Sequence, residues 1–213
     1  SSLVMTNVNV KNSGSWSAAK QIFVRDSGTW KTVKGIWVRQ SGSWVKAFPA
    51  APQTITYTTP GTYTYTVPNG IYLITASVYA GGGAGSAYTY ENGVYYPPGT
   101  GGSGGYRTNQ TLTTTPGGTI TIVVGAGGAA GSQTTNYAGN TYPIGQQPGG
   151  LSSITVTSGS VSATGGQPGS GYGASGSGGS PNGVSGGANG TGYGSPGSGI
   201  QAGSPGAVVF SWT

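Results

Sequence analysis

A stretch of 43 residues, 164–206, constrains this chain most, because it holds 18 glycines and no Lys, Arg, Asp or Glu. Such a composition is typical of disordered tracts, which cannot bury enough apolar surface to offset chain entropy. Disordered tracts, however, are normally charged. Glycines spaced by three residues, as at Gly173, Gly176 and Gly179, instead fit extended helices with three residues per turn, whose bare edges let neighbouring backbones pair. We therefore expect an ordered bundle of polyglycine-II-like loops, with a disordered tract as the alternative.

Two shorter tracts have the same character. Residues 80–106 contain Gly99, Gly102 and Gly105 in phase, and residues 125–150 begin with Gly125 and Gly128. With residues 164–206 they hold 36 of the 45 glycines. What the chain does should therefore depend on what these three tracts present.

The segments between the tracts alternate Thr, Tyr, Val and Ile, and Pro-Gly, Pro-Asn-Gly and Ser-Gly turn signals separate them. No helical period is visible. We predict an all-β chain whose main domain is a jelly-roll-like β-sandwich with long glycine-rich loops. The expected strands are Gln53–Thr58, Thr62–Val67, Ile71–Tyr79, Thr108–Thr115, Thr119–Val124, Ser152–Thr157, Ser160–Thr164 and Ala207–Trp212.

Simple alternation of strand direction makes a further prediction about these loops. If successive strands run up and down in turn, each glycine tract follows an upward strand. All three tracts then leave one pole of the sandwich, while the entry from the N-terminal segment lies at the other pole. A crossover between strands would break this parity.

Residues 6–47 contain three copies of a 14-residue repeat, each with a Ser-Gly turn between two short strands. If each turn has two central residues, Lys11 faces Trp16, Arg25 faces Trp30 and Arg39 faces Trp44. Each pair would make a cation–π contact of about 0.5–1 kcal/mol at an exposed site. We expect residues 1–50 to form a β-hairpin repeat module for attachment or oligomerisation, and residues 53–213 a separate sandwich domain. The residues assigned to mounting are Trp16, Arg25, Trp30, Trp37, Arg39 and Trp44.

Charge and chemistry limit the function. Seven of the eight basic residues precede residue 50, and their interleaving with Trp leaves nucleic-acid binding as an alternative that internal Arg–Trp pairing explains better. The chain has no Cys or His and only two carboxylates, Asp26 and Glu91. These residues supply no acid–base pair, activated nucleophile or metal cage. We expect no enzyme activity, no cofactor and no metal, and the lack of an 18-residue apolar run predicts no membrane insertion.

Tyrosines concentrate in the glycine tracts. Tyrosine beside Gly, Ser and Asn is the composition of adaptable recognition surfaces, although the same rings could only fill space between rods. The segment around Tyr95 is the most irregular, so we favour it as exposed. The candidate binding residues are Tyr88, Tyr90, Glu91, Tyr95, Tyr96, Tyr106, Tyr137, Tyr142, Tyr172 and Tyr193.

Three segments carry a family resemblance: TYTYTVPNGIYLITASVYAGGGAGS (62–86), PGGTITIVVGAGGAAG (116–131) and SSITVTSGSVSATGGQPG (152–169). They resemble the glycine-rich C-terminal domain of bacteriophage tail-fibre and tail-tip proteins, over about residues 53–213. The hairpin repeats also look like segments found beside such domains. In distal adhesins of T-even-like phages, packed polyglycine-II loops carry host-range variation, and the likeness there is one of loop style.

The resemblance implies a receptor-binding adhesin at the distal end of the phage tail. Its expected partners are a host cell-surface receptor (a glycan or an outer-membrane protein), other tail proteins and further copies of itself, with a trimer as one option. Two alternatives stay open: a structural or decorating virion protein without a receptor, and an ice-binding protein.

Overall fold

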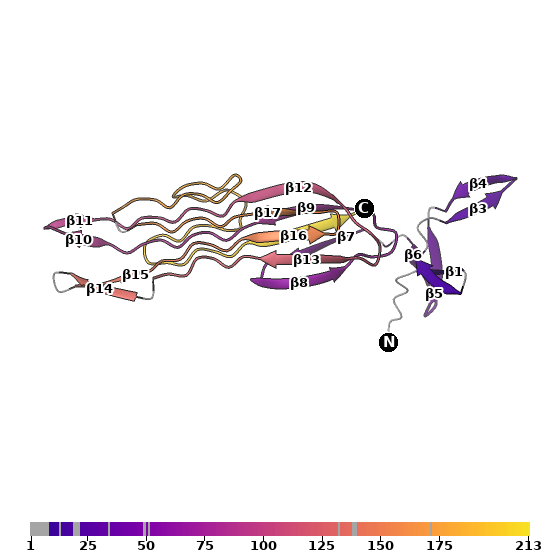
Figure 1. The fold of residues 1–213 in the computed structure, drawn as a ribbon, viewed down its shortest axis with the longest axis horizontal. Helices are drawn as coiled ribbons and strands as arrows, with labels where there is room; N and C mark the ends of the chain where they lie inside the picture. The colour runs from indigo at the N-terminus through magenta and orange to yellow at the C-terminus, as the bar shows by residue number, and fades with distance from the viewer. Residues whose placement is uncertain are drawn as a thin grey trace.

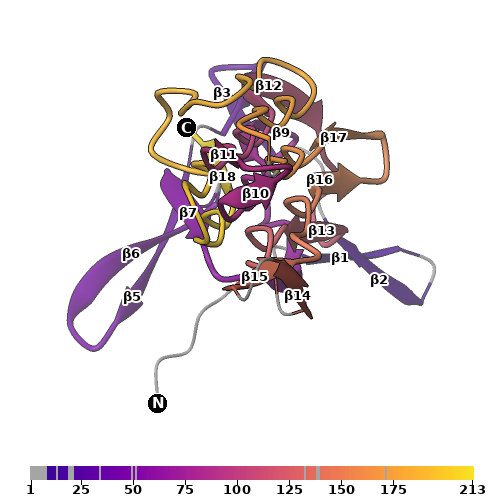
Figure 2. The ribbon, with the colours of Figure 1, turned by 90° about the vertical axis from the view of Figure 1, so that its left-hand side faces the viewer.

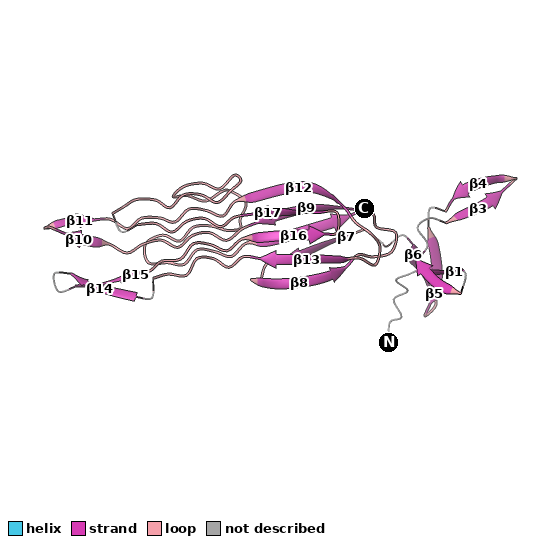
Figure 3. Cartoon of the chain, viewed as in Figure 1, coloured by secondary structure: helices cyan, strands magenta, loops and turns pink. Residues whose placement is uncertain are grey.

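The computed structural model describes residues 9–12, 14–18, 22–33, 35–48, 50, 52–131, 133–137, 140–170 and 172–213. These residues form strands and loops with no helix (Figure 3), which confirms the all-β prediction. Eight strands build two four-stranded antiparallel sheets. One sheet has the order β12 (Tyr106–Thr113), β9 (Leu73–Tyr79), β18 (Ala207–Trp212), β7 (Gln53–Tyr57); the other has β17 (Gly159–Ala163), β16 (Ser152–Val156), β13 (Thr119–Val124), β8 (Gly61–Thr66).

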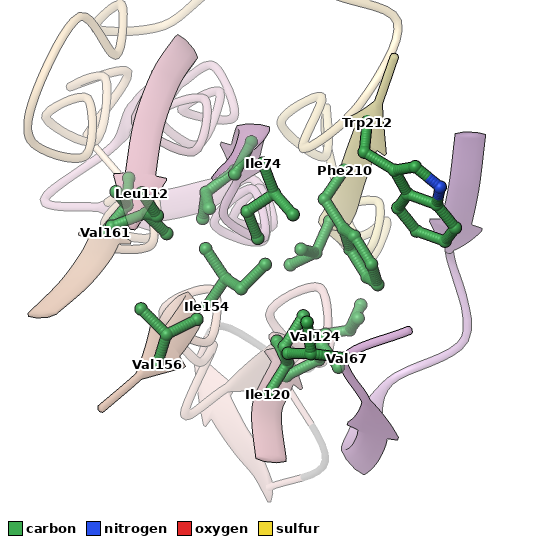
Figure 4. Close-up of a cluster of buried hydrophobic side chains, with 14 of the residues drawn as sticks. Val67, Ile74, Leu112, Ile120, Val124, Ile154, Val156, Val161, Phe210 and Trp212 are labelled. Atoms are coloured by element: carbon green, nitrogen blue, oxygen red, sulfur yellow. The ribbon is translucent and has the colours of Figure 1, made fainter. Parts of the chain in front are cut away.

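The two sheets enclose one hydrophobic core. Alternation along β9 turns Ile74, Ala76 and Val78 inward, where they are buried, and leaves Thr75 exposed. Ile154 of the second sheet and Phe210 of the first meet in this core (Figure 4). Each fully buried large side chain contributes about 1.5–3 kcal/mol. The sandwich is therefore a stable base from which the loops emerge.

The strand predictions agree with the structure to within two residues at each end. β13 and β18 have the predicted bounds, Thr119–Val124 and Ala207–Trp212. β9 pairs directly with β12, and β16 pairs directly with β17, so strands that follow one another in the sandwich are also neighbours in its sheets. The jelly-roll-like topology stays a prediction.

The predicted parity of the loops is confirmed. β7 and β9 are both antiparallel to β18, and β8 and β16 are both antiparallel to β13. β17 is antiparallel to β16 and therefore parallel to β13, so the tracts that follow β13 and β17 leave the same pole. Figure 1 shows that the tract after β9, in the other sheet, extends to the same side, to the left of the sheets. Figure 1 also shows the N-terminal hairpins at the opposite pole.

Three separate two-stranded sheets precede the sandwich. They pair β1 (Asn9–Asn12) with β2 (Ser15–Ala18), β3 (Phe23–Asp26) with β4 (Thr29–Thr32), and β5 (Ile36–Gln40) with β6 (Ser43–Phe48). At the second and third turns the Ser and Gly both have positive φ, 48° and 82° at Ser27-Gly28 and 46° and 87° at Ser41-Gly42. This is the two-residue hairpin turn whose twist matches its strands.

The predicted cross-strand partners in these hairpins are confirmed. The register places Lys11 opposite Trp16, Arg25 opposite Trp30 and Arg39 opposite Trp44. Ser13 and the side chain of Trp16 lie outside the described residues. The cation–π contact itself stays a prediction, as does the division of the chain into two domains after residue 50.

Two hairpins inside the glycine tracts were not predicted. They pair β10 (Thr89–Glu91) with β11 (Val94–Tyr96) and β14 (Gln133–Tyr137) with β15 (Asn140–Ile144), at the far end of the loops (Figure 1). The segment expected to be irregular is therefore regular. Its turn is Asn92-Gly93, with φ of 50° and 80°, and an Asn-Gly between alternating residues is the strongest short hairpin signal.

Candidate functional site

The first glycine tract supplies a central rod, residues 80–87, whose residues are all buried. Its backbone N–H groups donate in turn to three neighbouring segments, and the pattern repeats every three residues. Ala80, Gly83 and Ser86 donate to Gly105, Gly102 and Gly99; Gly81 and Ala84 donate to Gly150 and Gln147; Gly82 and Gly85 donate to Ser204 and Gln201, with N···O distances of 2.8–3.2 Å. A three-residue hydrogen-bond period is the mark of an extended three-fold helix.

The carbonyl groups of the same rod accept hydrogen bonds from three other segments. Gly81 O accepts from the Gly166 N–H at 3.0 Å, Gly82 O from Gly128 at 2.8 Å and Gly83 O from Gly197 at 2.9 Å. Three segments that accept and three that donate thus surround the rod. Segments of all three glycine tracts therefore meet around this rod, and Figure 2 shows the bundle from its tip.

Close approach of these backbones explains the demand for glycine. A Cβ added at Gly81, Gly82 or Gly83 would lie 2.0–2.2 Å from a carbonyl oxygen of a neighbouring segment, a different one each time. Side-chain-free positions are thus needed on every side of the central rod. Residues 98–105, by contrast, have the single side-chain-free edge that the three-residue glycine spacing predicts. A Cβ at Gly99, Gly102 or Gly105 would meet the backbone of residues 174–180.

The ordered bundle expected from the glycine spacing is therefore confirmed, with one correction. A single bare edge per rod suffices only at the periphery, because an inner rod contacts neighbours all round. The three-residue spacing of Gly187 and Gly190 has another origin, since neither would meet backbone within 4 Å and Gly190 has a φ of +75°.

Buried serine hydroxyls add hydrogen bonds to the backbone of neighbouring segments. Ser86 Oγ donates to the Ser170 carbonyl at 2.6 Å and accepts from the Gly99 N–H at 2.7 Å. Ser103 Oγ accepts from Val184 N–H and Ser152 Oγ from Gly125 N–H, both at 2.8 Å. An unpaired buried amide would cost about 1–3 kcal/mol, so these serines secure the ends and the outer loops of the bundle.

Two of the candidate tyrosines lie at the base of the bundle, near the sandwich. Tyr106 and Tyr193 are both half-buried and pack on Tyr79, with ring centroids 6.3 Å and 5.0 Å from it. The central rod separates them from the tip by roughly 20 Å, at about 3.1 Å per residue. The structure therefore does not bring them to the tip, and their visible role is to pack the junction of bundle and sandwich.

The tip of the bundle brings together the other described candidates. Tyr96 of β11 meets Tyr172 edge to face, with ring centroids 5.0 Å apart, although 76 residues of sequence separate them. Tyr172 is 56% exposed, Tyr88 46% and Val94 49%. We name Tyr88, Val94, Tyr96 and Tyr172 the tip cluster. Val94 is an apolar tip residue that the sequence reasoning missed, and alternation around Asn92-Gly93 was the signal for it.

The remaining candidates lie on the two tip hairpins, where only the backbone is described. Tyr90 pairs with Tyr95 and Glu91 with Val94 in the first hairpin, and Tyr142 pairs with Thr135 in the second, which also contains Tyr137. The side chains of Tyr90, Glu91, Tyr95, Tyr137 and Tyr142 lie outside the described residues.

Electrostatics contribute little to the tip, because Glu91 is the only charged residue in 80–105, 125–150 and 164–206.

The groups with shifted pKa values lie outside the glycine tracts. The ammonium of Lys31 and the hydroxyl of Ser27 hold the pKa of Asp26 below its ordinary value, and burial, followed by the nearby Tyr57, raises the pKa of Tyr65. A pocket of about 310 Å³ lined by residues 70–75 and 211–213 lies at the opposite pole.

Within the described residues, no three His, Cys, Asp or Glu side chains gather where they could hold a metal ion. That part of the chain also contains no helix long and apolar enough to cross a membrane. The tip cluster consists of three tyrosines and one valine, and Glu91 is the one carboxylate residue of the neighbouring hairpin strands.

A comparison with protein families bears on this arrangement. The family described as "Glycine-rich domain" matches residues 58–212, which is the sandwich from the end of β7 to the end of β18 together with all three tracts. The chain belongs to the glycine-rich domain family. The match begins after the six hairpin strands and after β7, so it covers the other seven strands of the sandwich and the rod bundle. No curated protein matches the chain.

Proposed function

We propose that this glycine-rich domain protein is a bacteriophage tail-fibre or tail-tip adhesin, which binds a host cell-surface receptor through its tip cluster and the two tip hairpins. The receptor would be a glycan or an outer-membrane protein. Exposed aromatic rings among small polar residues suit both, because rings stack on sugar faces and pack against protein loops.

The observation that carries the proposal is the placement of these residues. A hydrogen-bonded bundle extends from one pole of the sandwich and bears exposed tyrosines at its end, while the hairpins occupy the other pole (Figure 1). A rigid support lowers the entropy that a recognition surface loses on binding. The resemblance to phage tail proteins supplies the biological setting, a virion with this domain at the distal end of the tail.

The rest of the proposal concerns assembly. The N-terminal hairpins would mount the protein on other tail proteins, and the sandwich, with a jelly-roll-like topology, would serve as the base of the adhesin in a homo-oligomer. Catalysis has no place in this proposal, since binding alone suffices for attachment.

The test is adsorption of the purified, fluorescently labelled full chain to a panel of bacterial strains, before and after protease treatment or glycan removal. The double variant Tyr96→Ala/Tyr172→Ala should weaken adsorption roughly tenfold or more, because tyrosines that become buried on binding are frequent energetic centres of interfaces. Tyr72→Ala, which removes an exposed tyrosine at the opposite pole, is the matched control and should adsorb like the parent. Adsorption that survives loss of both tip rings would refute the assignment of the tip cluster.

The same measurement distinguishes the adhesin from a decorating virion protein without a receptor. A decorating protein would adsorb to no strain and would be distributed over the particle rather than at its distal end.

The ice-binding alternative has one observation in its favour. Thr64, Thr121 and Thr155 are register partners across β8, β13 and β16, a row of hydroxyl-bearing residues on one sheet. Thermal hysteresis of the full chain tests it directly.

A further inference from the structure

The hairpin module carries all of the net charge of the molecule. Residues 1–50 contain seven basic residues and one acidic residue, a net charge of 7 − 1 = +6, and the only other charged residues, Arg107 and Glu91, cancel. The single acidic residue, Asp26, is already bound, because Lys31 Nζ donates to its Oδ2 at 2.5 Å. The remaining cations of the module therefore lack a carboxylate partner within it.

Two of the hairpins gather tryptophan and arginine on the same face. Side chains of opposite partners share a face and alternate along a strand. The register thus puts Phe23, Arg25 and Trp30 on one face of β3–β4, with Asp26 and Lys31 on the other. In β5–β6 it puts Trp37, Arg39 and Trp44 together. We name these two sets the aromatic–cationic faces.

The aromatic–cationic faces are open to solvent in the structure. Trp44 is 70% exposed, Trp30 67% and Phe23 49%, and both arginines are exposed. In the described residues each hairpin is a sheet of only two strands, with its outer edges unpaired. An isolated two-stranded hairpin is marginally stable in water, so a bound partner would both cover the indoles and stabilise the module.

A second copy of this chain cannot neutralise these faces. The chain has two carboxylate side chains, of which Asp26 is paired with Lys31 and Glu91 lies in the hairpin at the far pole. Bringing two modules face to face would oppose two sets of like charges, which destabilises an interface. The counter-charge must come from another molecule.

We propose that the aromatic–cationic faces dock on an acidic protein surface that belongs to a different protein. Arg and Trp are the residues that most often dominate the energy of protein interfaces, with Arg pairing to carboxylates through two parallel hydrogen bonds. The free strand edges favour a protein over a nucleic acid, because only a polypeptide can pair with them as an added strand. This inference does not rest on what the tip binds.

The experiment is a titration of the full chain followed by tryptophan fluorescence. Four of the five tryptophans belong to the module, and Trp212 is buried in the sandwich core, so a change in emission reports on the hairpins. The probes are a short peptide that alternates Glu with Thr, its counterpart with Gln in place of Glu, and an oligothymidylate of the same net charge as the Glu peptide. Sedimentation velocity of the chain alone tests self-association.

The Glu peptide should bind, and added NaCl should weaken it, whereas the Gln peptide should not bind. The double variant Arg25→Gln/Arg39→Gln should bind the Glu peptide roughly tenfold more weakly, and Trp30→Ala should also weaken it. Arg107→Gln removes an equal charge outside the module and should bind like the parent. Circular dichroism should be the same for all variants, because each substitution is on the surface.

Four results would overturn the proposal. They are equal binding of the Gln peptide, tighter binding of the oligothymidylate than of the Glu peptide at matched salt, a dimer that Trp30→Ala dissociates, and no response to the Glu peptide at any concentration tested. The second result would assign the faces to nucleic acid and the third to another copy of the chain.

Discussion

At Gly83 the requirement for glycine comes from a neighbouring backbone. A Cβ there would lie 2.1 Å from the carbonyl oxygen of Gln167, in the segment beside the central rod. Gly83→Ala must push two hydrogen-bonded rods apart, and such overpacking costs typically 1–3 kcal/mol. We expect the melting temperature to fall by about 5–10 °C, as measured by calorimetry.

The matched control is Gly187→Ala in the same family of loops, where the nearest atom to the new Cβ is Val184 Cγ1 at 3.6 Å. That substitution should leave the melting temperature unchanged or raise it slightly, because alanine narrows the unfolded ensemble. Equal melting temperatures for the two variants would contradict the packing described for the central rod.

Asp26 offers a second test at the residue scale. Its pKa is held below its ordinary value of 3.8, first by the hydrogen bond from Lys31 and then by that from Ser27. A lowered carboxyl pKa stabilises the folded hairpin above the unfolded pKa, and this contribution is lost as the pH falls through the folded pKa. The side-chain carboxyl carbon of Asp26, followed by NMR, should titrate below 3.8, and Lys31→Ala should move the midpoint upward. If the titration midpoint of Asp26 is the same in the parent and in Lys31→Ala, the ion pair does not form in solution.

Among the elements, the central rod is a loop by secondary structure but is bonded like an inner strand. Residues 81–86 donate their N–H groups to three different segments inside a buried environment. Amide protection follows local stability rather than assignment to a strand. We expect these amides to exchange with deuterium as slowly as those of β9, and much more slowly than those of the tip hairpin β10–β11. Fast exchange at Gly83 and Ala84 would mean that the bundle opens independently of the sandwich.

The sandwich strands could be predicted from sequence because alternation of apolar and polar residues determines which side is buried. Ile74, Ala76 and Val78 belong to such a pattern. The tip hairpins could also have been predicted, since Asn92-Gly93 is a turn signal, but the surrounding glycines hid it. The identity of the central rod could not be predicted, because its glycines resemble those of every other tract and only their neighbours in space distinguish them.

Across the whole molecule, the net charge is located at one pole. The glycine tracts contribute one charged residue, Glu91, whereas the hairpin module has a net charge of +6. Surface electrostatic attraction weakens as salt shortens the screening length, and aromatic packing does not. Adsorption of the full chain to cells should therefore be insensitive to NaCl, while the module's binding to the Glu peptide should weaken steadily. Loss of cell adsorption in high salt would place the receptor contact on the hairpins instead of the tip.

The arrangement of the whole chain followed from counting strand directions, because antiparallel neighbours leave no freedom in where a loop emerges. Alternation put all three tracts at one pole, as observed (Figure 1). Their packing around residues 80–87 did not follow, since strand parity carries no information about which loop lies innermost.

The three-way bonding of residues 80–87 limits how such a chain can change in length. Deleting one residue from this rod would turn every later N–H by a third of a revolution, so that each would point at the wrong neighbour. Deleting or inserting three residues keeps the direction of every N–H group and changes only the length of the rod. Viable length variants of this protein should therefore differ in steps of three, lengthening or shortening the arm while its end points the same way.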